Sequence, residues 1–191
     1  MTALSQQYTG KPPESAYETL KTITFVIIAA IIVRTFIAQP FLVQGSSMEP
    51  NFHNADYLVV DKIRYRLGDP KRGEVIVFVS PEDSSQNYIK RVIGLPGDKV
   101  TIRDGEVLIN DQKINEDYIL EPVSVNPTSD PDFFLEQKLG NDEYFVMGDN
   151  RDHSSDSRRW GPLDKDKIIG RALVIVFPFS DFGTVDNPIE S

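Results

Sequence analysis

The chain has no cysteine among its 191 residues and only two histidines, His53 and His153. The absence of cysteine excludes thiol nucleophiles, disulfides and zinc–thiolate sites, and it is compatible with both oxidising and reducing compartments. Two histidines are too few for a histidine-rich metal site, and they leave only two possible bases for a Ser-His-Asp triad. Metal sites built on cysteine or on several histidines are therefore not expected.

Positive charge is also in short supply, because 20 basic residues face 29 acidic ones and the formal net charge is −9. The charges are mixed along the chain. An acidic surface repels phosphates, so a nucleic-acid partner is not expected. The length suits one domain, or a domain with a small lobe, and the composition is that of a globular protein.

No apolar run reaches the roughly 20 residues that a bilayer requires. The longest, residues 23–33, is followed by Arg34, so a span must extend past Arg34 or back to Leu20. Lys21 and Arg34 could both place their charges among lipid headgroups. A cleaved signal peptide, a buried core helix and an uncleaved signal anchor are the three possible interpretations.

The anchor is favoured, because the best cleavage position, after Ala38, has the bulky Phe36 at −3. We predict a transmembrane anchor over residues 20–38, preceded by a flexible tail over residues 1–19. Lys11 and Lys21 precede the apolar run and only Arg34 closely follows it. The positive-inside rule then favours a cytoplasmic N-terminus and an exported body.

The body has the pattern of an antiparallel β protein, with short β-branched runs bounded by glycine and proline. Asp104-Gly105 is a strong two-residue hairpin signal between the expected strands 99–102 and 106–109. Other strands are expected over residues 56–62, 74–79, 88–93, 143–147 and 168–177, and polar loops over 80–87, 121–133 and 148–162. The predicted fold is mainly β, with an N-terminal anchor helix, a catalytic β domain (39–98 and 143–191) and a small β lobe (99–142).

One segment of interest is a glycine-flanked serine turn, Gly45-Ser46-Ser47-Met48-Glu49-Pro50. Such a turn lets the backbone approach a substrate closely and leaves N–H groups unpaired, as an oxyanion hole requires. The same residues also suit a simple turn. Composition alone makes Ser46 as good a hydroxyl as Ser47.

A second segment, residues 88–98, places Lys90 in an apolar, strand-like run. In a strand, Tyr88 and Val92 share the face of Lys90. A lysine that serves as a general base needs a pKa near 7–8, against about 10.4 in water, and apolar burial can lower it. The alternative is an exposed lysine that discourages edge-strand aggregation.

A third segment, residues 148–158, supplies polar groups. Ser154 could orient the lysine, and Asp156 could pair with Arg158 to hold the loop. His153 is a rival base, with Asp149 or Asp152 as its orienting acid. The alternative is an ordinary solvated loop.

Taken together, these segments resemble the bacterial type I signal (leader) peptidases. The matching motifs, in order, are Arg-x-Phe-x-x-x-Pro-Phe from Arg34, Gly-x-Ser-Met-x-Pro, Arg-Gly-Glu-Val-Ile-Val-Phe, Tyr-Ile-Lys-Arg-Val-Ile-Gly-Leu-Pro-Gly-Asp and Gly-Asp-Asn-Arg-x-x-Ser-x-Asp-Ser-Arg. The resemblance covers Arg34 to Asp98 and Tyr144 to Phe177. Agreement at five ordered motifs is very improbable by chance.

The resemblance implies a role for each matching residue. Ser47 is the nucleophile, its backbone N–H forms part of the oxyanion hole, and Lys90 is the general base. Ser154 orients Lys90, while Asp156 and Arg158 support the site. Where some members have a serine that donates a second oxyanion hydrogen bond, this chain has Gly45, so that donor is a backbone group, a water or absent. Shallow pockets lined by Phe41, Val43 and Ile89 would select small residues at −1 and −3, the Ala-x-Ala pattern.

The implied protein is a membrane-bound serine endopeptidase that removes signal peptides from exported pre-proteins and requires no metal or cofactor. Its partners would be pre-proteins and membrane lipid. It would cross the bacterial plasma membrane once, with a cytoplasmic N-terminus and the catalytic domain on the outer face. The alternatives are a self-cleaving Ser-Lys protease of the repressor type, a tethered β binding domain without catalysis, and a Ser-His hydrolase that uses His153.

Overall fold

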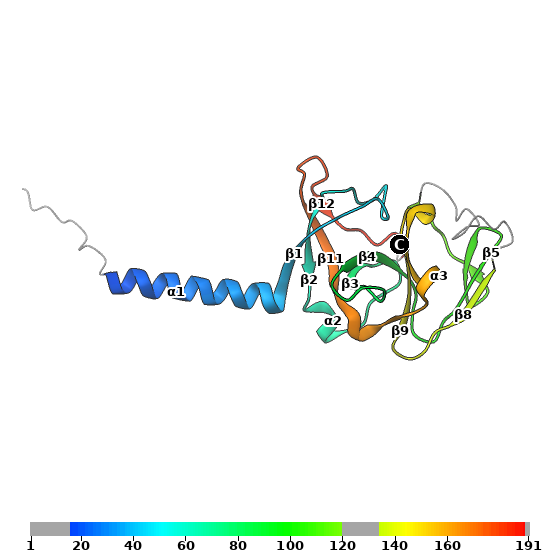
Figure 1. The fold of residues 1–191 in the computed structure, drawn as a ribbon, viewed down its shortest axis with the longest axis horizontal. Coiled ribbons are helices and arrows are strands. Elements are labelled where there is room, and N and C mark those ends of the chain that lie inside the picture. The colour runs from blue at the N-terminus through cyan, green and yellow to red at the C-terminus, as the bar shows by residue number, and fades with distance from the viewer. Residues whose placement is uncertain (1–15, 120–133, 190–191) are drawn as a thin grey trace, which may run out of the picture.

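A long N-terminal helix projects from a body built mainly of β-strands (Figure 1). The computed structural model describes residues 16–119 and 134–189. The loop predicted over residues 121–133 and the first 15 residues of the predicted tail lie outside these ranges. The mainly β class with an N-terminal apolar helix is confirmed.

The helix consists of α1 (Ala16–Ile32) and a π-helical continuation, η1 (Val33–Ile37). It has no buried residue, which excludes the core-helix interpretation. Together the two segments form 22 residues that are long and apolar enough to cross a membrane. The helix begins four residues before the predicted anchor, and Ala38 already belongs to the first strand.

The larger sheet has the strand order β1-β2-β11-β3-β4-β9-β10, with β12 also paired to β11, and its pairings are antiparallel. Its strands are β1 (Ala38–Leu42), β2 (Tyr57–Asp61), β3 (Val75–Val79), β4 (Asn87–Gly94), β9 (Glu143–Met147), β10 (Leu163–Asp164), β11 (Ile168–Phe177) and β12 (Gly183–Thr184). The predicted strands in this part of the chain are confirmed. β1 was not predicted, because its sequence reads as a continuation of the apolar anchor.

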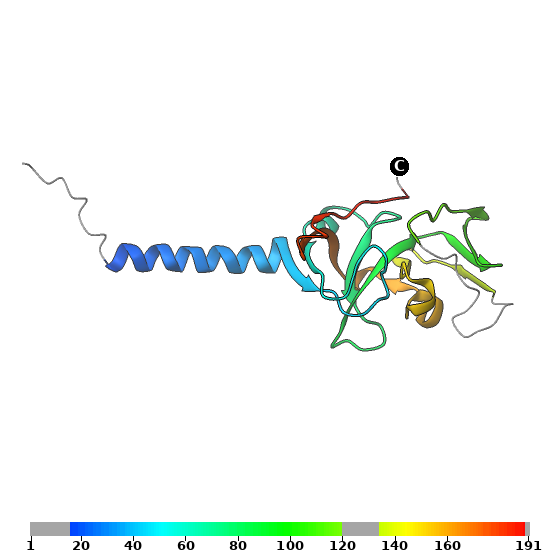
Figure 2. The same cartoon turned by 90° about the horizontal axis from the view of Figure 1, so that it is seen from above.

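The smaller sheet has the order β7-β6-β5-β8, and Figures 1 and 2 place it at the end of the body away from α1. Its strands are β5 (Lys99–Arg103), β6 (Glu106–Ile109), β7 (Gln112–Lys113) and β8 (Leu135–Lys138). The predicted hairpin is present: Asp104 and Gly105 have φ values of 49° and 75°, as a two-residue turn requires.

Short helices fill the connections. They are α2 (Arg64–Leu67), η2 (Arg151–His153), α3 (Ser157–Trp160) and η3 (Lys165–Lys167). Two of them lie within the stretch 148–162 that was predicted as a long loop. Asp156 caps α3 by accepting from the N–H of Arg158.

Three apolar clusters form the core. One, which includes Ile93, Phe145 and Met147, joins the two sheets. A second, which includes Met48, Phe52 and Leu58, holds the connection between β1 and β2 against the larger sheet. A third, which includes Phe78, Val92 and Tyr144, also belongs to the larger sheet. The site described next lies on the connection that the second cluster holds.

Candidate active site

Ser47 lies in the connection between β1 and β2, which is closed by backbone hydrogen bonds between Val43 and both Ala55 and Asp56. The side chains of Met48 and Phe52, 1% and 2% exposed, insert into the core beneath it. The serine is therefore fixed to the larger sheet by residues on its C-terminal side. It is held in place while its hydroxyl stays accessible, because Ser47 itself is only partly buried.

Gly45 begins the turn with φ = +89°, a conformation that side chains disfavour. Its N–H donates to Asn54 Oδ1 at 2.9 Å. The N–H of Gly45, which the sequence suggested as a second oxyanion donor, is thus already hydrogen-bonded to Asn54 in this structure. In the described part of the chain no hydrogen bond occupies the N–H of Ser47.

Lys90 is on β4, where it pairs in register with Ile76 of β3 and is 4% exposed. Its Nζ is 2.7 Å from Ser47 Oγ and donates to the carbonyl oxygen of Ile89 at 2.9 Å. The ring of Tyr88, which shares its strand face, lies 5.6 Å from Nζ. Ser47 and Lys90 are 43 positions apart in the sequence, and the fold brings them into hydrogen-bonding contact.

Burial lowers the pKa of the Lys90 amine from 10.5 to about 8, and the positive charge of Arg158 acts in the same direction. The carboxylates of Asp156 and Asp149 oppose this shift from a distance. No carboxylate in the described ranges forms an ion pair with Lys90. The amine is therefore neutral in a substantial fraction of molecules near neutral pH, as a general base must be.

A cleft of about 240 Å³ opens beside Ser47 and Lys90. Phe41, Val43 and Ile89, the residues predicted to line substrate pockets, all line it. Their side chains come from β1, from the start of the serine connection and from β4. The structure thus brings the predicted pocket residues and the predicted catalytic pair to one place.

Asp156 and Arg158 form the buried ion pair that the sequence suggested. Arg158 donates from Nε and Nη2 to the two carboxylate oxygens, each at 2.8 Å. Burial alone would raise the pKa of the Asp156 carboxyl, but the hydrogen bonds and charge of Arg158, with the N–H of Gly148, bring it below its usual value. The pair closes the segment after β9 on itself, because Asp156 accepts from the N–H of Gly148 and Arg158 donates to the carbonyl of Arg151. The contact with the serine connection is made by Asn150, whose N–H donates to the carbonyl oxygen of Ser47 at 3.1 Å.

Comparison with known proteins decides the family. The sequence model described as signal peptidase, peptidase S26, matches residues 16–177. The chain belongs to the signal peptidase family. A probable signal peptidase I-2 from Synechocystis is 40% identical over 94% of this chain and 82% of its own length. Signal peptidase I of Bacillus licheniformis is 34% identical over 96% of this chain and its whole length.

A signal peptidase I from Leptolyngbya laminosa is also similar, with 38% identity over 90% of this chain and 84% of its own length. These similarities make the chain a serine endopeptidase of the signal peptidase I type, an enzyme that removes signal peptides from pre-proteins. Its N-terminal apolar helix fits the membrane anchor that the resemblance implied.

Ser154 makes no hydrogen bond to Lys90 in this structure. Its Oγ is buried, and its interaction with the carboxylate of Asp156 helps to lower the pKa of that carboxyl. The hydroxyl instead lies beside Gly148, where a Cβ would overlap both Ser154 Oγ and the carbonyl oxygen of Ser47. Gly148 thus lets the two segments approach closely, and the orienting role of Ser154 stays a prediction.

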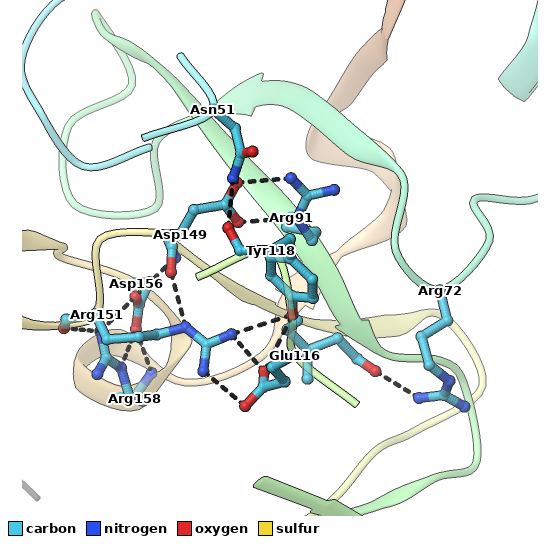
Figure 3. Close-up of polar contacts among 11 residues, drawn as sticks. Asn51, Arg72, Arg91, Glu116, Tyr118, Asp149, Arg151, Asp156 and Arg158 are labelled. Carbon is cyan, nitrogen blue, oxygen red and sulfur yellow. Dashed lines mark hydrogen bonds and ion pairs between the residues drawn. The ribbon is translucent and has the colours of Figure 1, made fainter. Parts of the chain in front are cut away.

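Sequence reasoning missed a buried polar network on the other side of β4 (Figure 3). Arg91 donates to Asp149 through Nε at 2.8 Å and Nη2 at 2.6 Å, and its guanidinium lies 4.5 Å from the ring centre of Tyr118. Asn51, four residues after Ser47, donates to both Asp149 and the carbonyl of Tyr118. The available signal was Arg91 itself, since a charged side chain in a buried strand needs a partner.

Arg151 extends the network. It donates to both carboxylate oxygens of Glu116, to the hydroxyl of Tyr118 at 3.1 Å and to the carbonyl of Gly148 at 3.0 Å. Arg158 in turn donates to the carbonyl of Arg151 at 2.6 Å. The segment after β9, the serine connection and the small lobe are thereby linked by charge-assisted hydrogen bonds.

His153, the rival base, is exposed, and Asp149, one of its proposed orienting acids, is occupied by Arg91. Neither observation favours a Ser-His arrangement. The other histidine, His53, lies 3.6 Å from Asp181, and with Asp56 these residues could offer three ligand atoms to a metal ion. Two of the three side chains are partly or largely exposed, and the His53–Asp181 contact is that of an ordinary surface ion pair.

Proposed function

We propose that Ser47 and Lys90 are the nucleophile and general base with which this signal peptidase cleaves pre-proteins. The observation that carries the proposal is the 2.7 Å separation of Lys90 Nζ and Ser47 Oγ, at a lysine that is 4% exposed. Burial moves the pKa of Lys90 to about 8, close to what a base needs. A lysine kept for structure alone would be expected to have a carboxylate partner.

In the proposed mechanism, neutral Lys90 takes the proton of the Ser47 hydroxyl as Oγ attacks the carbonyl carbon of the −1 residue. The backbone N–H of Ser47 stabilises the resulting oxyanion. The C–N bond then breaks, and the protonated Lys90 gives its proton to the leaving amine. Lys90 then takes a proton from a water molecule as the water attacks the ester carbon. The bond between that carbon and Ser47 Oγ breaks, Lys90 returns the proton to Oγ, and the signal peptide leaves with a free carboxyl end.

We propose that the cleft beside the dyad selects small residues at −1 and −3 of the substrate. Its volume of about 240 Å³ is shared by the apolar side chains of Phe41, Val43 and Ile89. Val43 is 5% exposed, so the floor of the cleft is part of the packed core and cannot move far to admit a larger side chain. Large side chains would be rejected by overlap, which gives an Ala-x-Ala preference.

Ser154, Asp156 and Arg158 are proposed as supporting residues. Asp156 accepts from the N–H of Gly148 at 3.0 Å, and this glycine lies against both Ser154 and Ser47. The Asp156–Arg158 pair would act on catalysis by fixing that approach. Ser154, buried beside the same glycine, would orient Lys90 once a substrate occupies the cleft.

We further propose that the anchor crosses the plasma membrane once, with the N-terminus cytoplasmic and the body outside. The strand β11 pairs with β2, the neighbour of β1, and its end carries exposed aromatic side chains, with Phe177, Phe179 and Phe182 50%, 81% and 64% exposed. Soluble proteins rarely leave such groups together in water, whereas a membrane interface accommodates them. The cleft would then lie near the bilayer from which signal peptides emerge.

The test is cleavage, in detergent, of a pre-protein with an Ala-x-Ala site. We expect wild type to cut after the second alanine, and Ser47→Ala and Lys90→Met to lose at least about a thousandfold in kcat/KM. Ser46→Ala is the matched control for the serine, since it removes the neighbouring hydroxyl, and it should retain activity. Lys99→Met is the control for the lysine.

Two results would contradict the proposal. If Lys90→Met still cuts, another group is the base, and loss of activity in His153→Asn would identify it. If wild type cuts but accepts bulky residues at −1 and −3 equally well, the cleft is not the specificity pocket.

A further inference from the structure

A basic segment follows β2 at the end of the body from which the anchor leaves. Its basic residues are Lys62, just before α2, and Arg64 and Arg66, on α2. Figure 1 shows α2 beside the start of β1. The N–H of Lys62 donates to the carbonyl of Ile37, the last residue of the possible membrane span, at 2.9 Å. The backbone of Lys62 is therefore fixed at the level where the apolar helix ends.

The charges of this segment are incompletely neutralised. Lys62 Nζ reaches only the amide oxygen of Gln39, at 3.4 Å, and Arg66 lies 5.1 Å from the ring centre of Phe36. Neither has an ion pair with a carboxylate in the described ranges. Such a concentration of free positive charge is unexpected in a chain with a formal net charge of −9.

The acids nearby are already occupied. Arg64 shares the single buried carboxylate of Glu74 with Arg171, at 3.3 and 3.2 Å, so this pairing leaves one positive charge in excess. Asp61 Oδ1 accepts from the N–H groups of Ile63 and Arg64 and thereby caps the start of α2. Of the three cations, Arg66 is exposed and Lys62 partly exposed, and these two have no ion pair with a carboxylate in the described ranges.

Apolar side chains accompany these cations. Leu67 is 85% exposed and Ile63 is 36% exposed, on the same short helical segment. Phe36, against which Arg66 rests, is 48% exposed and belongs to the end of the anchor. Exposed leucine beside unpaired lysine and arginine is the pattern of a surface that inserts apolar groups below a layer of anionic headgroups.

We propose that the segment Lys62–Leu67 is a docking site for anionic phospholipid at the outer end of the anchor. This inference rests on the proposed transmembrane orientation of α1. Lys62 and Arg66 would contact lipid phosphates, and Leu67 would enter the acyl boundary. Docking would fix the tilt of the body on the membrane and so the height of the cleft above the bilayer.

The test exploits the absence of cysteine, because Leu67→Cys gives a protein with a single thiol for an environment-sensitive fluorophore. The full chain is reconstituted in vesicles of phosphatidylcholine, with or without phosphatidylglycerol, and quenching by brominated lipid is measured. We expect strong quenching only with phosphatidylglycerol. Removing both charges with Lys62→Gln and Arg66→Gln should weaken docking by roughly fivefold per charge, and high salt should act in the same direction.

Matched controls separate the possible failures. Arg103→Gln with Lys113→Gln removes the same charge from the small lobe and should leave the quenching unchanged, as should a label placed by Gln112→Cys. A label placed by Ile28→Cys reports the anchor itself. If that label is not quenched in either vesicle, the proposed transmembrane span fails and the docking proposal fails with it.

Three results would overturn the docking proposal alone, given a quenched Ile28→Cys label. The first is equal quenching of the Leu67→Cys label with and without phosphatidylglycerol. The second is equal quenching in the Lys62→Gln, Arg66→Gln variant. The third is a spectral shift of the label in detergent produced by inorganic phosphate alone, which would make free phosphate, rather than lipid, the ligand.

Discussion

Lys90 and Arg91 are neighbours on β4 and both are buried, yet the fold gives them opposite surroundings. Arg91 donates two hydrogen bonds to the carboxylate of Asp149 and lies over the ring of Tyr118. Lys90 contacts a serine hydroxyl and a backbone carbonyl, and no carboxylate of residues 16–119 or 134–189 is paired with it. Both are nearly inaccessible, at 4% and 2% exposure, so burial alone does not distinguish them.

The comparison shows how one strand can hold both a proposed general base, Lys90, and a cation that ties distant segments together, Arg91. A buried cation with a bidentate carboxylate keeps its charge and holds distant segments together. A buried amine without one has its charged form destabilised, and its pKa falls toward the range of a general base. The hydrogen-bond partner, rather than the depth of burial, distinguishes the proposed general base Lys90 from the structural cation Arg91.

The largest effect is expected when Lys90 is replaced by arginine, the residue that stands at position 91. Lys90→Arg preserves a positive charge but places there a group that stays protonated at every accessible pH. We expect kcat/KM to fall by at least about a thousandfold, with no recovery at alkaline pH. Lys99→Arg, made at a partly exposed lysine that is paired with Asp111, is the control. Substantial activity of Lys90→Arg would mean that position 90 does not supply the base.

The opposite change removes the partner of Arg91. Asp149→Asn leaves a buried guanidinium without its carboxylate, and we expect a loss of about 3–5 kcal/mol in the free energy of unfolding. Denaturant unfolding in detergent measures it. Glu106→Gln, which breaks the exposed pair with Lys113, should cost less than about 1 kcal/mol. Equal losses in the two variants would show that the Arg91 pair is no more important than a surface pair.

Removing the unpaired amine should have the reverse effect on stability. The gap between 10.5 and about 8 in the pKa of Lys90 corresponds to about 3 kcal/mol of strain in the protonated form. We therefore expect inactive Lys90→Met to be more stable than wild type by about 1–3 kcal/mol near pH 7. The folded pKa is the lower one, so this difference should be full below pH 8 and shrink as pH rises toward 10.5. A destabilised Lys90→Met would contradict the account.

The smallest expected effect is the pH dependence of kcat/KM in the wild-type enzyme, which tests the proposed base Lys90 without a substitution. Only neutral Lys90 accepts the serine proton, so kcat/KM should rise about tenfold per pH unit and level off near pH 8. The measurement is a pH series with an Ala-x-Ala substrate. A single rising limb is expected, because one group supplies the base. A limb centred near 6.5 would instead indicate a histidine.

Much of this arrangement follows from local sequence, and some of it does not. β3 and β4 were predictable from β-branched runs, and the β5–β6 hairpin from Asp104-Gly105. The resemblance identified Ser47 and Lys90 as a pair. β1 was missed because its apolar residues continue those of the anchor, so no composition change marks where helix gives way to strand.

The network around Arg91 could not be read locally. Arg91 and Asp149 are 58 residues apart, and their contact depends on the pairing of β4 with β9, which no single segment encodes. The engagement of the Gly45 N–H by Asn54 depends likewise on the folded shape of the connection. The position of Ser154 is a third such case, because the neighbouring Gly148 lies against Ser47, which is about a hundred residues away in the sequence.

The central claim is that Lys90 is a buried amine with a lowered pKa, and its most direct test is NMR titration of lysines labelled with ¹³C at Cε. The full chain is studied in detergent, and the resonance that disappears in Lys90→Met is assigned to Lys90. We predict that this resonance titrates near pH 8, while the exposed lysines titrate above pH 10. A Lys90 resonance that titrates with the exposed lysines would contradict the account.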